Sequence, residues 1–427
     1  MTDPARSGAP SDAPTGAPSP AAAAGGAAPT ARRMPLSRSI LVLGSLSAFG
    51  PLSMDLYLPA LPELAAGLST SDALAQTTMS ACMIGLGAGQ LIAGPLSDRW
   101  GRRWPLIVGV ALFALLSLAC ALAPTIELLI TARFLQGLAG SAGVVVSLAI
   151  ARDMFSGAEL SRMLSLLALV SSGAPILAPV LGGQLVRIMD WRGVFLVLAG
   201  IGAVLLVIAL TGLRETLPPD RRHTGGARLT AAHFAALAHD RQYRRILLVA
   251  AFSSAGFFAY LSMSPFVFQE QFAATPAGFS LVFAANSLAV LAGSQVNGVA
   301  VRRAGPRRMY LLALTLSACV GIVLLGAALL GAGFGVFAGI LCAMMFATGL
   351  SGPNGSTLAL HHHGVRAGTA SSVYGVVMFG AGSLAVPLVA LLGTSAITMA
   401  ATMATGTVLA AAAALLLVRP ELVRNGL

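Results

Sequence analysis

The hydrophobic and polar positions of this chain alternate in long blocks. Apolar segments of similar length follow one another, and short polar turns separate them. Each segment is close to the roughly 20 residues that an α-helix needs to cross a bilayer. The pattern is typical of an all-α polytopic membrane protein with 12 transmembrane helices. The segments are predicted at about residues 38–60, 73–96, 104–123, 125–151, 162–187, 193–213, 245–268, 278–300, 308–330, 333–359, 369–392 and 395–418.

A longer polar stretch near the middle of the chain divides these segments into two groups of six. We expect residues 37–213 and 245–419 to form two six-helix bundles, joined by a cytoplasmic linker at 214–244. Residues 1–36 are rich in Ala, Pro, Gly and Ser and are predicted to be a disordered tail. Prolines interrupt its apolar content, so we do not interpret it as a signal peptide. Residues 420–427 are expected to be a short cytoplasmic C-terminus.

The composition agrees with a membrane protein, and the distribution of charge predicts its orientation. Only 10% of the residues are charged, against about 25% in soluble domains. All 26 basic residues are arginines; 23 fall on the side of both chain ends, Arg187 and Arg192 fall on the other side, and Arg133 alone falls within a segment. Because arginine-rich loops stay in the cytoplasm, both ends are predicted to be cytoplasmic. This rule also accounts for the net charge of +11 without a nucleic-acid partner.

The sequence offers no site for a cofactor or a metal. Its four cysteines lie far apart in apolar segments, without the spacing of metal ligands, and we expect no disulfide. The side chains of the run His361-His362-His363 cannot all face one ion on a helix. No Gly-Lys-Ser/Thr phosphate-binding element is present, which argues against transport driven by ATP. We therefore expect a protein that is not an enzyme and has no cofactor, with the proton motive force as its energy source.

The two groups of segments carry a weak internal repeat. Residues 94–103 and 298–307 share both glycines and two arginines at an offset of 204 residues, and 134–140 and 346–352 share four positions at an offset of 212. Similar offsets in the same order indicate a duplication, as in many secondary transporters. Arg302 stands where the first copy has Asp98. The charged residues that carry the function are therefore expected in the first half.

Two charged residues inside the predicted segments are candidates for proton coupling. Apart from charges within three residues of a segment end, Asp55 is the only acid that we place inside any segment, and Arg133 is the only embedded arginine. Because a charge in the membrane is costly, each should face a cavity or a partner, and Arg133 is the natural counter-charge of Asp55. Two alternatives stay open: Asp55 could cap a helix at the outer interface, and Arg133 could extend to the outer surface.

Several motifs resemble those of the major facilitator superfamily. The charged turn at 94–103 resembles its loop between the second and third spans, and the residues around 133–137 and 178–183 resemble two further motifs of twelve-span drug:proton antiporters. Residues 54–62, 151–155 and 367–372 resemble the Bcr/CflA subfamily of bicyclomycin-resistance and chloramphenicol-efflux transporters. The chain departs from the antiporter pattern at Ala174 and Ala178, where that pattern has Gly.

This resemblance implies a set of gating residues. Asp98 is expected to accept hydrogen bonds at the N-terminus of the eleventh segment, near Thr369. Arg102 or Arg103 is expected to pair with Asp153. The fifth segment is expected to have a kinked, close-packing face. The complete set is Gly94, Asp98, Arg99, Gly101, Arg102, Arg103, Asp153, Pro179, Gly182 and Gly183.

The resemblance also implies a central cavity between the first, fourth, seventh and tenth segments. An apolar lining with few polar groups suits amphipathic compounds. Each ring could instead face lipid or a neighbouring helix. The substrate-binding candidates are Phe49, Asp55, Tyr57, Arg133, Phe257, Phe258, Tyr260 and Phe346.

These features together predict a proton-coupled antiporter of the bacterial inner membrane. It is expected to export drugs or similar small amphipathic compounds by alternating access, as a monomer whose partners are protons, membrane lipid and a drug-like substrate. One alternative is a proton-coupled transporter of a metabolite such as an amino acid or a sugar-like compound, and another is a receptor or scaffold that transports nothing. Import of a charged nutrient would usually need further charged residues, and Glu270 is the only acid between Asp240 and Glu421.

Overall fold

Long α-helices make up almost all of the computed structural model, which describes residues 36–222, 235–361 and 367–417. Within these ranges no strand is present. The predicted tail at 1–36, except its last residue, lies outside the described residues, as do part of the linker, His362, His363 and the last ten residues.

Each of the twelve predicted segments coincides with one long helix, so the all-α polytopic fold is confirmed. Ten of the described helices are long and apolar enough to span a membrane, and a bent pair at 39–50 and 52–67 makes an eleventh. The twelfth long helix, α6, has 29 residues. The first-half helices are α1 (Leu36–Asp55), α3 (Asp72–Trp100), α4 (Arg103–Ala121), α5 (Ile126–Met154), α6 (Gly157–Leu185) and α7 (Trp191–Gly212). The second-half helices are α9 (Arg241–Phe266), α10 (Pro276–Ala304), α11 (Pro306–Leu329), α12 (Phe334–Leu360), α13 (Ala367–Ala390) and α14 (Ala396–Leu417).

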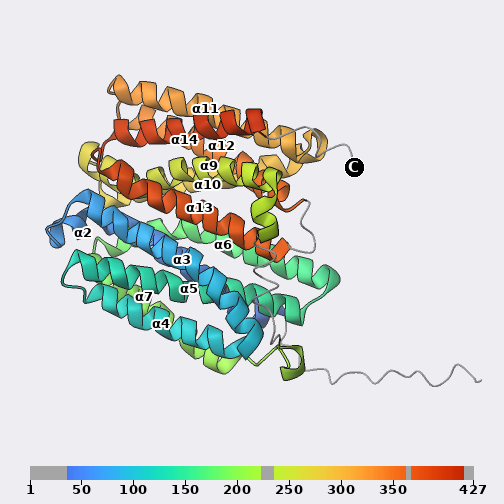
Figure 1. Ribbon diagram of the computed structural model, residues 1–427. Helices are drawn as coiled ribbons and strands as arrows, with labels where there is room; N and C mark the ends of the chain where they lie inside the picture. Colours follow the sequence, from blue (N-terminus) through green and yellow to red (C-terminus); the bar gives the residue numbers. More distant parts are fainter. Residues whose placement is uncertain (1–35, 223–234, 362–366, 418–427) are drawn as a thin grey trace, which may run out of the picture. The chain divides into compact units, whose positions relative to one another are not determined.

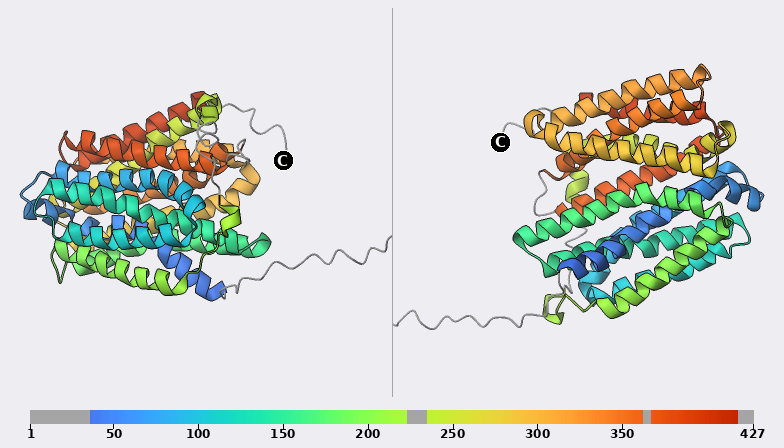
Figure 2. Two further views of the ribbon diagram at one scale, coloured as in Figure 1. Left: turned by 60° about the horizontal axis from the view of Figure 1, so that its bottom comes forward. Right: turned by 180° about the vertical axis from the view of Figure 1, so that it is seen from behind.

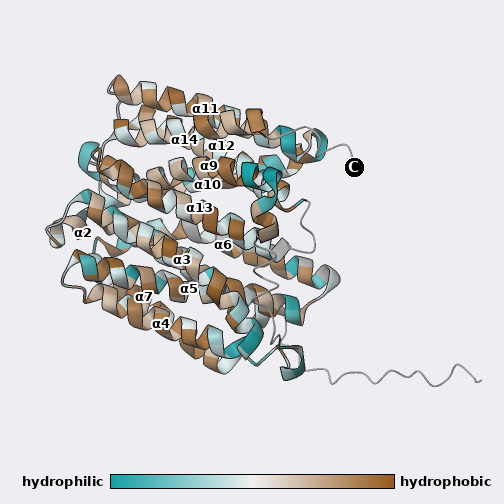
Figure 3. Cartoon of the chain, viewed as in Figure 1, coloured by the Kyte–Doolittle hydropathy of each residue, from teal (hydrophilic) through white to brown (hydrophobic). Residues whose placement is uncertain are grey.

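Three short elements interrupt this pattern at one end of the bundle. A 3₁₀ turn, η1 (Leu58–Ala60), and a short helix, α2 (Leu61–Gly67), follow α1. The π-helical turn η3 (Val267–Gln271) follows α9. We call this end, which carries Arg187 and Arg192, the arginine-poor end. The opposite end, where α3 meets α4, is the arginine-rich end. Figure 3 shows that hydrophilic residues gather near the helix ends.

The internal repeat predicted from the sequence is visible in the helix boundaries. Helices α3 and α10 are both 29 residues long. Each begins after a hydroxyl cap, Ser71 or Thr275, whose oxygen accepts a bond from a backbone N–H in the first helical turn. Each ends at a glycine in the left-handed region, Gly101 at φ +92° and Gly305 at φ +78°.

Glycines allow close packing inside each half. In the first half, α3 crosses α5, and a Cβ at Gly85 would overlap the carbonyl oxygen of Phe134. In the second half, α10 crosses α12 in the same way, and a Cβ at Gly293 would overlap the carbonyl oxygen of Phe346. Small residues let helix backbones approach closely where the membrane supplies no hydrophobic driving force. The same device therefore builds both halves.

The described helices of the two halves lie side by side within one compact unit (Figures 1 and 2). Helix α3 packs against α13, and α6 packs against α10. At the arginine-poor end the halves are joined, because Gln76 Nε2 donates to Thr394 Oγ1 over 3.1 Å and Gln269 Nε2 donates to the carbonyl of Pro59 over 3.0 Å. At the arginine-rich end a cavity of about 590 Å³ opens between α3, α5 and α13.

Candidate functional site

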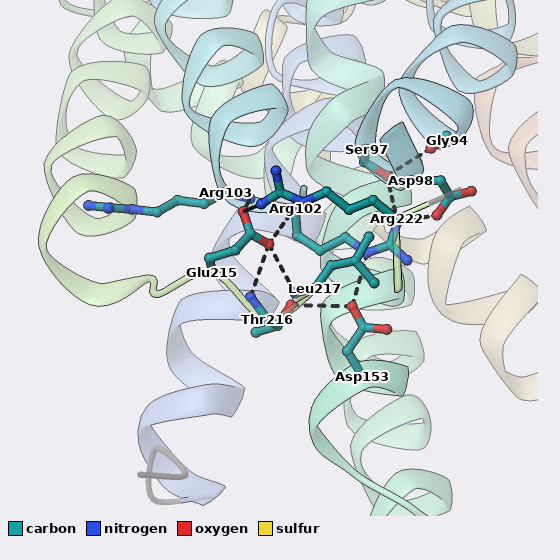
Figure 4. Close-up of polar contacts among 10 residues, drawn as sticks. All are labelled: Gly94, Ser97, Asp98, Arg102, Arg103, Asp153, Glu215, Thr216, Leu217 and Arg222. Atoms are coloured by element: carbon teal, nitrogen blue, oxygen red, sulfur yellow. Dashed lines mark hydrogen bonds and ion pairs between the residues drawn. The ribbon is translucent and has the colours of Figure 1, made fainter. Parts of the chain in front are cut away.

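The charged turn between α3 and α4 is organised around Arg102. Its Nε donates to Asp153 Oδ2 at the end of α5 over 2.9 Å, and its Nη1 donates to Ser97 Oγ over 2.8 Å and to Asp98 (Figure 4). Arg102 is 8% exposed, so these bonds neutralise and satisfy a nearly buried guanidinium. Of the two arginines expected to pair with Asp153, the structure pairs Arg102. The Arg103 guanidinium instead donates to the backbone carbonyl of Leu210.

Glu215, just beyond the end of α7, closes the same turn from the other side. Its carboxylate accepts hydrogen bonds from the backbone N–H groups of Arg102, at 2.8 Å, and Arg103, at 3.3 Å (Figure 4). The amides of Thr216 and Leu217 also donate to it, each over 3.0 Å. Burial alone would raise the pKa of Glu215, but these four donors outweigh it and lower the pKa below its ordinary value. Glu215 therefore serves as the missing N-terminal cap of α4.

The other gating candidates on α3, on the turn after it and on α5 lie at the arginine-rich end. Gly94, Asp98 and Asp153 line the cavity at that end together with Thr369 at the start of α13. The side chain of Asp98 is 50% exposed, and its described bond goes to Arg102 rather than to α13. Arg99 lies in the last turn of α3. Gly101 ends that helix in the left-handed conformation that favours glycine.

The gating candidates on α6 lie at the arginine-poor end, against other helices. A Cβ at Gly182 would overlap the carbonyl oxygen of Leu56, just after α1, and a Cβ at Gly183 would overlap the side chain of Ser280 on α10. Pro179 is buried one turn earlier on the same helix. Gly183 thus lies where the first half touches the second.

Asp55 is the last residue of α1 and is only 6% exposed. Its neighbours Met54 and Tyr57 share one core cluster with Tyr260 and Phe283 of the second half. Among the described residues, no cation forms an ion pair with Asp55. The carboxylate is thus buried near the contact between the halves.

Arg133, in the N-terminal part of α5, is completely buried. Its Nη1 donates to Gln136 Oε1 over 2.6 Å and to the carbonyl of Ser53 over 3.3 Å. The guanidinium lies 4.3 Å from the ring centre of Tyr57, within the range of a cation–π interaction. Its Nε and Nη2 have no hydrogen-bond partner in the described part of the chain. The expected ion pair with Asp55 is absent from this structure, because Arg133 is directed toward Tyr57 and Gln136.

The aromatic substrate candidates do not gather in one place. Phe49 packs inside the first half, with its ring centre 4.7 Å from that of Phe113 on α4. Phe346 is partly buried and packs against a separate cluster that contains Met309 and Leu350. In this structure the two rings contact helices of their own half, and Phe49 also lines a cavity between α1 and α7.

Phe257, Phe258 and Tyr260 form a continuous aromatic surface on α9. Phe257 lies 5.7 Å from Phe258 and 6.1 Å from Tyr260, between ring centres. Tyr260 stacks on Phe283 of α10 at 5.8 Å and 18°. Phe258 and Tyr260 belong to the core cluster that contains Tyr57, and Phe257 packs against it. Together with Tyr57, four of the six aromatic candidates therefore border the contact between the halves.

Several residues of the site had not been singled out as site residues. Glu215 and Ser97 complete the charged turn, Gln136 fixes Arg133, and Asn286 donates to Tyr260 Oη over 3.1 Å. Glu215 follows the last apolar segment of the first half, so its position at a helix end was the only signal in the sequence. Among the described residues, no group of three or more His, Cys, Asp or Glu side chains could hold a metal ion.

Comparison with known proteins agrees with this geometry. Residues 43–387 match the Major Facilitator Superfamily. The chain is 38% identical to the "Uncharacterized MFS-type transporter YdgK" of Bacillus subtilis (strain 168), over 85% of this chain and 90% of that protein. It is 30% identical to the "Bicyclomycin resistance protein homolog" of Haemophilus influenzae, over 82% and 88%, and 29% identical to "Multidrug resistance protein MdtL" of Klebsiella pneumoniae, over 85% and 91%.

Solved structures support the same assignment at the level of the fold. A D-xylose-proton symporter superposes with a TM-score of 0.74 at 16% identity, covering 92% of this chain and 99% of that one. The nucleoside transporter NupG superposes with a TM-score of 0.75 at 14% identity, covering 90% and 100%. From its helices, its charged turn and these similarities we conclude that the chain belongs to the major facilitator superfamily, as a multi-pass membrane transporter of small molecules and not an enzyme.

Proposed function

We propose that the chain is a proton-coupled antiporter that exports drugs or similar small amphipathic compounds across the bacterial inner membrane. In this proposal it works as a monomer by alternating access, and the arginine-rich end and both chain ends face the cytoplasm. The observation that carries the proposal is Asp55, a buried carboxylate near the contact between the halves, with no cation paired to it in the described residues.

A carboxylate in this position is suited to exchange a proton for a substrate. An ionised acid that is withdrawn from water without a counter-charge is costly, so Asp55 favours the protonated form when the halves close over it. When the site opens to the side of lower proton concentration, the proton can leave and a substrate can replace it. Arg133 keeps a fixed positive charge, because a guanidinium does not give up its proton readily. Asp55 is then the carrier, and Arg133 sets the local potential.

The contacts at the two ends are consistent with one state of such a cycle. The arginine-poor end is closed by the hydrogen bonds from Gln76 and Gln269, whereas the arginine-rich end has its cavity. In the opposite state we expect that cavity to close and Asp98 to approach the N-terminus of α13, where unsatisfied N–H groups favour an anion. The charged turn would then act as the inner lock.

The proton gradient is sufficient for useful export. A membrane potential of about 100 mV contributes about 2.3 kcal/mol per charge, and one pH unit contributes about 1.4 kcal/mol. For one proton exchanged against one neutral molecule, the total of about 3.7 kcal/mol supports a gradient of roughly 500-fold. That is enough to protect a cell from a toxic compound.

Two observations favour drug-like substrates over charged metabolites. The described core where the halves meet contains many apolar and aromatic side chains. Relatives at 29–30% identity carry names that refer to bicyclomycin and multidrug resistance. The structural likeness to a xylose symporter and a nucleoside transporter lies below 17% identity and concerns the fold alone.

The test is chloramphenicol accumulation in an efflux-deficient bacterium that expresses the wild-type chain or Asp55→Asn at equal levels. We expect the wild type to lower accumulation, and we expect either a protonophore or Asp55→Asn to abolish that effect. Glu127→Gln is the matched control, because Glu127 is an exposed acid in the first turn of α5. It should export like the wild type.

Two results would contradict the proposal. If Asp55→Asn lowered accumulation as well as the wild type does, Asp55 would not be the proton carrier. If the wild type changed neither chloramphenicol accumulation nor that of a broad panel of amphipathic drugs, export of such compounds would be wrong. A metabolite would then become the leading substrate class.

A further inference from the structure

The second half contains a buried polar pair that packing alone leaves incomplete. Asn286 on α10 donates from Nδ2 to Tyr260 Oη on α9 over 3.1 Å. The two residues are 2% and 3% exposed. In the described part of the chain, Asn286 Oδ1 has no hydrogen-bond partner. A buried carbonyl oxygen without a donor is unfavourable, and such groups in native proteins commonly mark a site that something else occupies.

A second acceptor lies near this pair in the other half. Met54 and Tyr57, close to Asp55 in the chain, share one core cluster with Tyr260, and no cation in the described residues pairs with the Asp55 carboxylate. Tyr260 accepts from Asn286 and still has its own proton to donate. In the described part of the chain Asn286 Oδ1 is therefore an acceptor without a donor, and Asp55, when ionised, adds a second acceptor from the other half. This excess of acceptors is complementary to a group that carries N–H or O–H.

The surroundings of the pair suit the apolar part of a ligand. Tyr260 stacks on Phe283 with ring centres 5.8 Å apart, and Phe257 lies 6.1 Å from Tyr260. Aromatic faces of this kind hold flat rings by offset contact and attract cations through their π electrons. Phe257 is only partly buried, so the aromatic surface is not completely covered by the protein itself.

We propose that Asn286 and Tyr260 form the part of the substrate site that recognises a hydrogen-bond donor, opposite Asp55. The preferred ligands are amphipathic compounds with an aromatic portion and an amino, amide or hydroxyl group. This inference rests on the proposed function, since it specifies which amphipaths the same site selects. Asn286 is a specificity-determining residue that the proton-coupling role of Asp55 does not require.

Equilibrium binding to the purified full-length chain in detergent tests this proposal with two probes. Ethidium is a planar aromatic cation with two amino groups, and tetraphenylphosphonium is an aromatic cation without N–H or O–H. Asn286→Leu removes the acceptor at similar volume, and we expect it to weaken ethidium binding about 5- to 10-fold, the range for one hydrogen bond. Tetraphenylphosphonium binding should change less than about twofold. Asn286→Asp keeps an oxygen acceptor and should retain the preference for ethidium.

Tyr260→Phe is the second variant, because it removes one hydroxyl and preserves the ring. It frees the Asn286 amide to turn, so we expect it too to lower the ratio of ethidium to tetraphenylphosphonium binding. Ser262→Ala is its control: this buried hydroxyl on the same helix donates within the helix, to the carbonyl of Ala259. The control should leave the ratio unchanged.

Three results would overturn the inference: equal loss of both probes in Asn286→Leu, no loss of ethidium binding, or a wild-type chain that binds neither probe. Binding is measured without a proton gradient. A failure of Asp55-dependent export would therefore leave the binding result intact, and a failure of donor recognition would leave the export result intact.

Discussion

The interaction between Glu215 and the start of α4 can be tested by the smallest change available, Glu215→Gln. The wild-type carboxylate has two acceptor oxygens; Oε1 receives the amides of Arg102, Thr216 and Leu217, and Oε2 receives that of Arg103. Glutamine keeps one oxygen and replaces the other with an NH₂ group. That NH₂ group would face a backbone N–H, so two hydrogen-bond donors would meet without an acceptor. It also removes the negative charge from the N-terminus of α4.

The expected loss of stability follows from these contacts. Loss of a helix N-cap costs about 0.5–2 kcal/mol, and loss of a negative charge at a helix N-terminus costs about 0.3–1 kcal/mol. The Glu215 side chain is 28% exposed and glutamine retains part of the cap, so we expect about 1–2 kcal/mol in total. For a bundle of this size, that should lower the melting midpoint by about 2–4 °C per kcal/mol.

The assay is thermal unfolding of the purified chain in detergent, followed by the loss of its monodisperse peak in size-exclusion chromatography. The pKa of Glu215 is lowered by folding, so its stabilisation is complete above its ordinary pKa of 4.5 and disappears as the pH falls through the folded value. The difference between wild type and Glu215→Gln should therefore be largest near pH 7 and shrink below about pH 4.5. Asp220→Asn is the control, since Asp220 lies exposed in the same polar stretch.

An unchanged midpoint at pH 7 would refute this account of the cap. A loss in Glu215→Gln that persisted undiminished at low pH would refute the role of the charge, because the wild-type group would by then be protonated. If Asp220→Asn lost as much as Glu215→Gln, the effect would belong to the net charge of the linker rather than to α4.

Two further substitutions test the packing at Gly182 and the role of Arg133. Gly182→Ala places a Cβ on the carbonyl oxygen of Leu56, so we expect a marked loss of folded protein by size-exclusion chromatography; normal yield and melting would show that the two helices can separate without cost. Arg133→Met fills a similar volume and removes a buried guanidinium with two unpartnered nitrogens, so its melting midpoint should match or exceed that of the wild type while proton-driven export is lost. Retained export in Arg133→Met would exclude a role in coupling.

The helices and their order could be predicted from the sequence because membrane insertion depends on the composition of each segment by itself. Each crossing must satisfy its own backbone and present apolar side chains, and these properties are local. The repeat was equally visible, since α3 and α10 keep a hydroxyl cap before the first turn and a left-handed glycine after the last.

The partners of the charged residues could not be predicted in the same way. Asp55 and Arg133 were both identified from their cost in a membrane, but the direction of the Arg133 side chain depends on where Gln136 and Tyr57 lie around it. Phe49 and Phe346 look like ligand-binding rings in the sequence. Whether a ring faces a cavity or a neighbouring helix depends on helix rotation, which hydropathy does not encode for a segment that is apolar all round.

The sequence by itself determined the membrane class of this protein, the place and number of its helices, its duplication and the residue types that carry charge. Only the tertiary structure decided which charges meet. Glu215 reaches the amide of Arg102 across 113 positions of the chain, and Asn286 reaches the hydroxyl of Tyr260 from a neighbouring helix. Hydropathy is a sum over neighbours along the chain, whereas a hydrogen bond depends on a distance in space, and packing alone sets that distance.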